Sequence, residues 1–195
     1  GLIPGSTIPS PKGFGEDYGI RWLFLDGAIE SNWTYYKNNR TAGAAIPANV
    51  SRDELAVLFT GINPDATDSQ TVTPEGIEFD TIVNLSRNLR LIWNYSSNKL
   101  KNTDRYPVLK SVQADARRQG FSTPLTDAFL ATVPEGTPSA GFTKVRSNLV
   151  ASYRFSNGPL KGFSIGGGAQ YRERTYQGNF DLNRDGFAEE LWTPG

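Results

Sequence analysis

The chain has 195 residues, and its 20 Lys and Arg balance 20 Asp and Glu, so no net charge favours nucleic acid or an acidic partner. It contains no Cys and no His. Disulfides, thiolate or imidazole metal sites and Ser-His-Asp or Cys-His catalytic centres are therefore excluded. No apolar run approaches the roughly 18 residues of a spanning helix, but the alternating strands of a membrane barrel would leave no such run either.

The first predicted element is a β-hairpin over residues 17–36, DYGIRWLFLDGAIESNWTYY. An Asp-Gly dipeptide between two alternating runs is a strong hairpin signal. With Asp26 and Gly27 as the turn, one face is apolar and aromatic and the other is mostly polar, and a one-residue slip would mix them. The apolar face then pairs Phe24 with Ile29, Trp22 with Ser31, Ile20 with Trp33 and Tyr18 with Tyr35.

Two more hairpins are predicted over residues 76–97 and 144–174. The second turns at residues 86–88, and the third at a segment that contains Gly158 and Gly162. The glycine run at residues 166–168 is a poor strand former, which marks a bend or a close backbone approach. The polar faces carry Glu78, Asp80, Asn84, Arg90, Asn94 and Ser96, and then Arg146, Asn148, Ser152, Arg154, Ser164, Gln170 and Arg172.

Long connections at residues 38–74 and 98–143 separate the hairpins, and another begins at Thr175. Because short turns and long connections alternate, we expect all the long loops at one end of the sheet. In the first loop, Ser51 and Glu54 have the spacing of a capping box for a short helix. The second loop is predicted to be helical up to Gly120.

Two environments are compatible with the alternation: the interior of a soluble antiparallel sandwich or barrel, and a lipid bilayer. The predicted strands run about ten residues, the length that a tilted strand needs to cross a bilayer. Aromatic residues near the strand ends suit the girdles of a membrane barrel: Tyr18, Tyr35, Trp93, Tyr95, Phe155 and Phe163. We therefore predict an all-β, antiparallel up-and-down transmembrane β-barrel segment, with about six long strands and long extracellular loops that carry short helices.

The strand sequences resemble the C-terminal half of the barrel of TonB-dependent outer-membrane receptors. The stretch SPKGFGEDYGIRWLFLDGAIESNWTYY resembles a late barrel hairpin of that family, and TPEGIEFDTIVNLSRNLRLIWNYS and NLVASYRFSNGPLKGFSIGGGAQYR resemble the two that follow. The matching positions are Pro11, Gly19, Asp26, Gly27, Tyr35 and Tyr36, then Gly76, Glu78, Leu89, Leu91 and Tyr95, then Tyr153, Phe155, Gly158, Leu160, Gly162 and Tyr171. The long loops do not take part in the resemblance.

The resemblance implies that residues 1–195 are part of a 22-stranded barrel in the bacterial outer membrane, incomplete at both ends, around a plug domain that this sequence lacks. It implies no enzyme, but a receptor that imports a scarce solute, such as a siderophore–iron chelate, cobalamin or an oligosaccharide. The partners implied are outer-membrane lipid, the solute and, through the plug, the TonB complex. The alternatives are a soluble β-sandwich that binds carbohydrate or serves adhesion, and a passive porin.

One segment, DLNRDG at residues 181–186, has the alternating oxygen ligands and the glycine of a calcium loop. The candidate ligands are Asp181, Asn183, Asp185, Glu189 and Glu190. Trp192 stands where an EF-hand needs a bidentate Glu, so the alternative is a solvated acidic turn.

Other candidates for chemistry are weaker. Glu78 and Asp80 share a strand face at a distance that would suit a glycosidase pair, but nothing else in the sequence supports an enzyme. Several aromatic and basic residues of the second long loop could meet a ligand, although we expect them to pack and solvate the loop instead: Arg105, Tyr106, Arg117, Arg118 and Phe121.

Overall fold

The computed structural model describes residues 10, 12–63, 66–180, 182–183 and 189–195. Its strands are β1 (Gly13–Phe24), β2 (Ile29–Ala45), β3 (Thr67–Asn84), β4 (Leu89–Thr103), β5 (Val145–Arg154), β6 (Ser164–Arg172), β7 (Thr175–Phe180) and β8 (Glu189–Thr193). Its helical segments are the π-helical η1 (Asn49–Leu55) and the α-helices α1 (Ala56–Leu58), α2 (Pro107–Arg118) and α3 (Pro124–Thr132). Among the described residues, no helix has the length and apolar character needed to cross a membrane.

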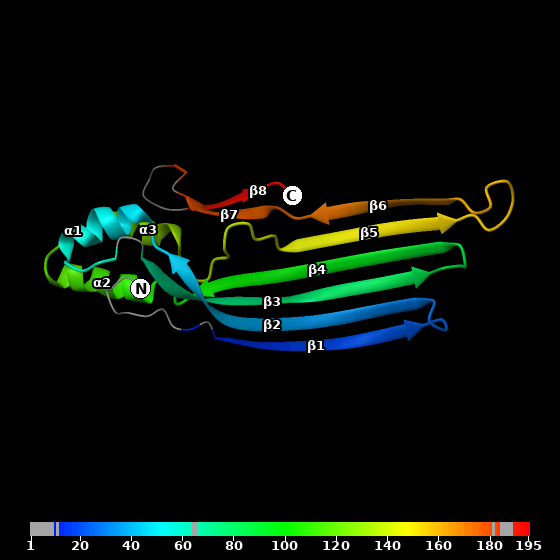
Figure 1. Cartoon of the computed structure of the whole chain (residues 1–195), viewed down its shortest axis with the longest axis horizontal. Helices are drawn as coiled ribbons and strands as arrows, with labels where there is room; N and C mark the ends of the chain where they lie inside the picture. Colours follow the sequence, from blue (N-terminus) through cyan, green and yellow to red (C-terminus); the bar gives the residue numbers. More distant parts are fainter. Residues whose placement is uncertain (1–9, 11, 64–65, 181, 184–188) are drawn as a thin grey trace.

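The strands β1 to β6 form one antiparallel sheet in sequence order, with short turns at one end and helices at the other (Figure 1). This confirms the predicted up-and-down order and the placement of the long loops. The predicted pairing of the first hairpin is also confirmed, since Ile20 lies opposite Trp33 and Tyr18 opposite Tyr35. At the first turn Asp26 and Gly27 have φ angles of 53° and 86°, as an Asp-Gly hairpin turn requires.

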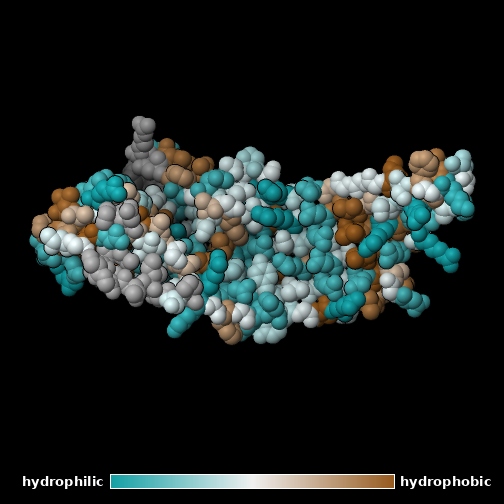
Figure 2. Space-filling model, in the orientation of Figure 1, coloured by the Kyte–Doolittle hydropathy of each residue, from teal (hydrophilic) through white to brown (hydrophobic). Residues whose placement is uncertain are grey.

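The register is constant from β1 to β6, so the two faces of the sheet can be defined by residue parity. The apolar face consists of the even-numbered residues of β1 and the odd-numbered residues of β2 to β6. The polar face consists of the remaining residues of these strands. Figure 2 shows a mostly hydrophilic surface over the middle of the sheet, with a hydrophobic group of side chains toward the turn end. Three apolar residues, Ile82, Ile92 and Val150, lie side by side on the polar face.

Two predictions about the strands need correction. The strands β2, β3 and β4 have 17, 18 and 15 residues, longer than the predicted ten, because they continue beyond the apolar part into the loop end. The segment from Thr175 is not simply a loop, because β7 and β8 pair there as a second small sheet. The glycines at 166–168 stay within β6.

The helices at the loop end pack into a small hydrophobic core of their own, which we call the loop cap. Its buried residues come from both long loops and from the adjoining strand ends: Ala44, Ile46, Val50, Leu55, Ala66, Tyr106, Leu109 and Val112. Phe129 adds its ring to this core from α3, in an edge-to-face contact with Tyr106. The two long loops therefore form one packed unit instead of two independent excursions.

Two buried carboxylates hold the helices of the loop cap in place. Asp68 of β3 accepts the Leu109 N–H in the first turn of α2 at 2.9 Å. Glu54 of η1 accepts the Leu125 and Thr126 N–H groups in the first turn of α3 at 2.7 and 2.8 Å. Each acid satisfies N–H groups that have no partner within their own helix. The capping box predicted for Ser51 and Glu54 is therefore wrong, since Glu54 caps a different helix and the Ser51 hydroxyl donates to Pro47.

Candidate functional site

The apolar face of the sheet is open to the surroundings although it carries large hydrophobic side chains. Ile20, Trp33 and Leu149 are 58%, 52% and 45% exposed. None of the helices described above packs on this face, because their core lies at the loop end. A sheet must cover its hydrophobic face with another apolar phase. Within the described residues, the chain does not supply that cover.

Polar atoms on the apolar face bond to one another. The Trp33 indole N–H donates to the Ser31 hydroxyl at 2.8 Å, and that hydroxyl lies 2.8 Å from the Thr81 hydroxyl. The Trp93 indole N–H donates to the Ser147 hydroxyl at 3.0 Å. Water would satisfy these groups without such pairs, whereas hydrocarbon would leave an unpaired donor at a cost of several kcal/mol. The pairing suits an apolar solvent.

A row of alternating charges ends the apolar face toward the loop cap. Glu16, Lys37, Glu75 and Lys99 lie directly side by side across β1 to β4, one step beyond the row of Tyr18, Tyr35 and Ile77. Lys99 and Glu75 form an ion pair of 3.9 Å. From Ile77 to the turn at residue 85 the apolar stretch of β3 is about 26 Å along the strand, or about 20 Å of height at a tilt of about 40°, which covers most of the roughly 25 Å apolar band of a membrane barrel.

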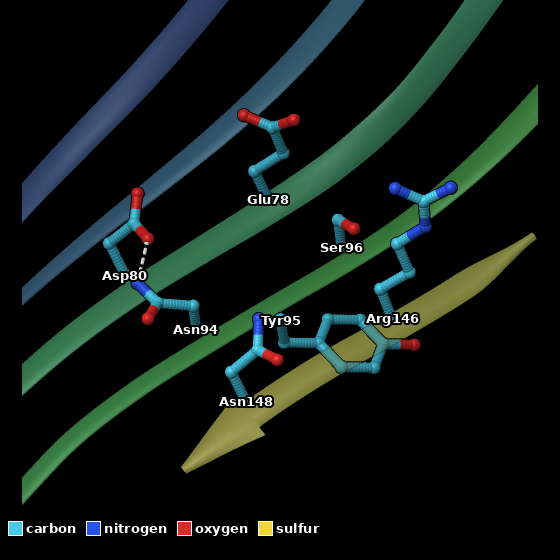
Figure 3. Close-up of a pocket in the computed structure, with 7 residues that line it drawn as sticks. All are labelled: Glu78, Asp80, Asn94, Tyr95, Ser96, Arg146 and Asn148. Carbon is cyan, nitrogen blue, oxygen red and sulfur yellow. Dashed lines mark hydrogen bonds between the residues drawn. The ribbon is translucent and has the colours of Figure 1, made fainter. Parts of the chain in front are cut away.

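The polar face contains an open pocket of about 240 Å³ over β3, β4 and β5. Figure 3 shows the residues that line it: Glu78, Asp80, Asn94, Tyr95, Ser96, Arg146 and Asn148. Asp80 accepts a hydrogen bond from the Asn94 amide at 2.5 Å. Arg146 lies beyond Ser96 on the far side of the pocket from Glu78 (Figure 3). The pocket therefore offers carboxylates from β3, a guanidinium from β5, and amides from β4 and β5.

The carboxylates Glu78 and Asp80 lie on one face as predicted, but they do not form a catalytic pair. Asp80 is engaged by an amide, and both side chains are exposed on an open sheet. A general acid needs an environment that separates its pKa from that of its partner. Nothing in this pocket excludes water from one carboxylate and not from the other.

The structure gives a clear reason for glycine at position 76. A Cβ atom at Gly76 would lie 2.6 Å from the Ser97 carbonyl oxygen and 3.0 Å from the Tyr36 hydroxyl. That hydroxyl passes over Gly76 and donates to the Asn98 side-chain oxygen at 2.7 Å. The bare position thus allows a tyrosine of β2 to reach β4 across the intervening strand.

The loop residues considered as ligand contacts are mostly occupied within the loop cap, as expected. The Arg105 guanidinium donates to the Pro134 carbonyl and to the Thr137 hydroxyl, and the Tyr106 hydroxyl donates to the Ala45 carbonyl. Arg117 and Arg118 pair with Asp127 and Asp115. Phe121 is the exception, because its ring is 42% exposed beside Phe59.

Electrostatics in the loop cap favour this packed arrangement. Burial raises the pKa of Tyr106, so its hydroxyl remains a proton donor to Ala45. Partial burial alone would raise the pKa of Glu135. This effect is outweighed by hydrogen bonds from the Lys110 side chain and the Arg105 backbone N–H and by the positive charges of Lys110 and Arg105, so that the pKa lies below its ordinary value. Glu135 therefore remains a carboxylate that ties the end of β4 to α2.

The predicted calcium ligands are only partly within the described residues, since Asp181 and Asp185 lie outside them. Among the ligands that are described, the Glu189 carboxylate accepts the Leu182 N–H at 3.0 Å and the Asn183 amide N–H at 2.7 Å. Glu190 accepts the Trp192 indole N–H. The described residues contain no group of three or more acidic side chains that could hold a metal ion. The calcium site stays a prediction.

Calcium titration into the full-length protein tests this prediction. We expect wild type to release heat and to gain protease resistance in the segment 181–190, since a cation relieves the repulsion between Asp181 and Asp185. The double variant Asp181→Ala/Asp185→Ala should show neither effect. Equal heats and equal cleavage for the two proteins would leave the segment as a solvated acidic turn.

Comparisons with known proteins agree with this architecture. No protein-family model and no curated protein matches the chain. Its fold resembles that of Pseudomonas aeruginosa FpvA bound to a heterologous pyoverdine and iron, at 16% identity and a TM-score of 0.58, over 94% of this chain and 20% of that one. A structure of the FpvAI–pyocin S2 complex matches equally, at 16% identity and 0.58, over 93% and 20%. The chain thus spans about a fifth of the length of the structures it matches, and the fold class predicted from sequence is confirmed.

Proposed function

We propose that this chain forms part of the barrel wall of a TonB-dependent outer-membrane receptor that imports an iron–siderophore complex. The observation that carries the proposal is the open apolar face, with its paired indoles and the charged row at its end. The fold match supports it, because FpvA is a TonB-dependent siderophore receptor. In this proposal the apolar face meets outer-membrane lipid, the polar face lines the barrel and the loop cap lies outside the cell.

A soluble β-sandwich is the less favoured alternative. A sandwich covers each apolar face with a second sheet about 10 Å away. The described residues form a single-layer sheet of six strands, and β7 and β8 form the only other sheet among them, at the loop end. A passive porin shares the alternation of faces and loops, and only the proposed plug domain and its coupling to TonB separate the two functions.

The receptor role requires parts outside this sequence. A plug domain would contact the TonB complex and couple import to the proton-motive force, and the remaining strands would close the barrel. The solute class is proposed from the iron–pyoverdine complex in the matched structure. Cobalamin and oligosaccharides remain alternative solutes, and catalysis is not part of the proposal.

Fractionation and uptake of the full-length protein test the proposal. We expect the protein in the outer membrane, soluble only with detergent, and uptake of radioactive iron from its chelate that stops when TonB is deleted. A binding screen of the purified receptor against iron chelates and oligosaccharides would identify the solute. A full-length protein that is soluble without detergent would support the sandwich, and uptake that persists without TonB would support the porin.

A further inference from the structure

The polar face of the sheet is divided by charge. The strands β4, β5 and β6 contain no Asp and no Glu. Their polar-face cations are Arg90, Arg146, Arg154 and Arg172. The polar face of β3 carries the carboxylates Glu78 and Asp80 in the pocket of Figure 3. The polar face therefore carries acidic side chains over β3 and basic side chains over β4 to β6.

Two of these arginines are directly opposed. Arg146 of β5 pairs in register with Arg172 of β6, so two positive side chains project from neighbouring positions of the same face. Like charges directly opposite each other destabilise a sheet. The guanidinium group of arginine is always charged in proteins, so the repulsion between the two side chains persists.

The neighbours of this pair do not neutralise it. Arg146 lies opposite Ser96 on its other side, and Asn148 and Gln170 occupy the next polar-face row. Within the described residues, neither guanidinium takes part in an ion pair. Glu78 is in the same row but two strands from Arg146, about 9–10 Å at the spacing of neighbouring strands. The two side chains form no ion pair across that gap in the described part of the chain.

We propose that Arg146 and Arg172 form an oxyanion subsite that holds a carboxylate, phosphate or similar group of the imported solute. Two planar guanidiniums can donate paired N–H bonds to one oxyanion, and its negative charge removes their repulsion. The amides of Asn148 and Gln170 lie beside them as further donors. This inference depends on the proposed function in one respect: that function makes the imported solute the source of the oxyanion.

Its position suits a solute that arrives from the loop side. The row that contains Glu78, Ser96, Arg146 and Arg172 lies three residues along the strands from the charged row on the opposite face, since Glu78 follows Glu75 by three positions. The subsite therefore lies near the loop end of the proposed membrane-spanning part. Glu78 and Asp80, on the other side of the pocket, would repel a second anion and would attract a cationic part of the same solute.

Titration of inorganic phosphate into the detergent-solubilised full-length receptor tests the subsite by calorimetry. We expect the double variant Arg146→Gln/Arg172→Gln to bind phosphate at least about 10-fold more weakly than wild type, since it loses two charge-assisted donors. The matched control is Arg90→Gln/Arg154→Gln. It removes the same charge from the same face, but these arginines lie opposite Ser152 and Ser164 and not opposite each other. The control should change affinity less than about 3-fold.

Three outcomes would overturn the subsite. If phosphate affinity fell equally in the two double variants, phosphate would be bound by the overall positive charge of β4 to β6 and not by the pair of arginines. Equal affinity in wild type and Arg146→Gln/Arg172→Gln would place phosphate elsewhere. If wild type did not bind phosphate and Arg146→Gln/Arg172→Gln lost thermal stability, the two arginines would instead pair with a carboxylate of the receptor's own chain. Fractionation of the receptor does not depend on either arginine, so it tests the proposed function separately.

Discussion

If the chain forms the proposed membrane barrel, Leu149→Arg is expected to destabilise the full-length protein in lipid vesicles by about 2–4 kcal/mol, the cost of an arginine that faces the middle of a bilayer. Leu149 is 45% exposed on the apolar face, in register with Trp93 on one side and Ala169 on the other. Several apolar rows separate it from the turns and from the charged row, so a guanidinium there has no short path to water. Urea unfolding in vesicles, followed by tryptophan fluorescence, measures the loss.

The adjacent residue provides the control. Asn148 is the next residue of β5 and lies on the polar face, opposite Asn94 and Gln170. Asn148→Arg adds the same side chain to the same strand, and we expect a loss below about 1 kcal/mol because interior positions of a membrane barrel face water. If Asn148→Arg cost more than Leu149→Arg, the apolar face would not meet lipid and the soluble sandwich would be favoured.

The sequence was sufficient to predict the sheet because its register is a local property. Asp26 and Gly27 require one turn geometry, and a shift of one residue would have moved Trp22 and Trp33 onto the polar face. The same logic assigned Arg146 and Arg172 to one face. It could not place them opposite each other, because the long turn between Phe155 and Phe163 leaves the register of that hairpin open.

The loop cap could not be predicted because its contacts join distant parts of the chain. The spacing of Ser51 and Glu54 matches a local capping box, but the Glu54 carboxylate bonds to residues more than seventy positions further on. No local signal distinguishes the two uses of a glutamate. The helix α3 does have a local signal, since Pro124 follows Thr123 at its first position, where proline is favoured.

Glu54→Ala is expected to loosen the loop cap by about 2–3 kcal/mol, because it leaves buried donors at the start of α3 without a partner. Glu54 is 7% exposed and accepts three hydrogen bonds, from the Leu125 and Thr126 N–H groups and from the Thr126 hydroxyl. Pro124 has no N–H, so Glu54 serves the first two N–H groups of this helix. Amide hydrogen exchange in residues 125–132 of the full-length protein should accelerate by roughly 30- to 150-fold.

Asp53→Ala is the matched control for this prediction. Asp53 precedes Glu54 in η1 and carries the same charge, but its side chain is exposed. Exchange in α3 should then stay within about 3-fold of wild type, since an exposed charge contributes little to stability. Exchange in residues 77–84 of β3 and 89–97 of β4 should be unchanged in both variants, because these parts of the strands pair outside the loop cap. Equal exchange of α3 in the two variants would mean that the buried carboxylate does not hold this helix in place.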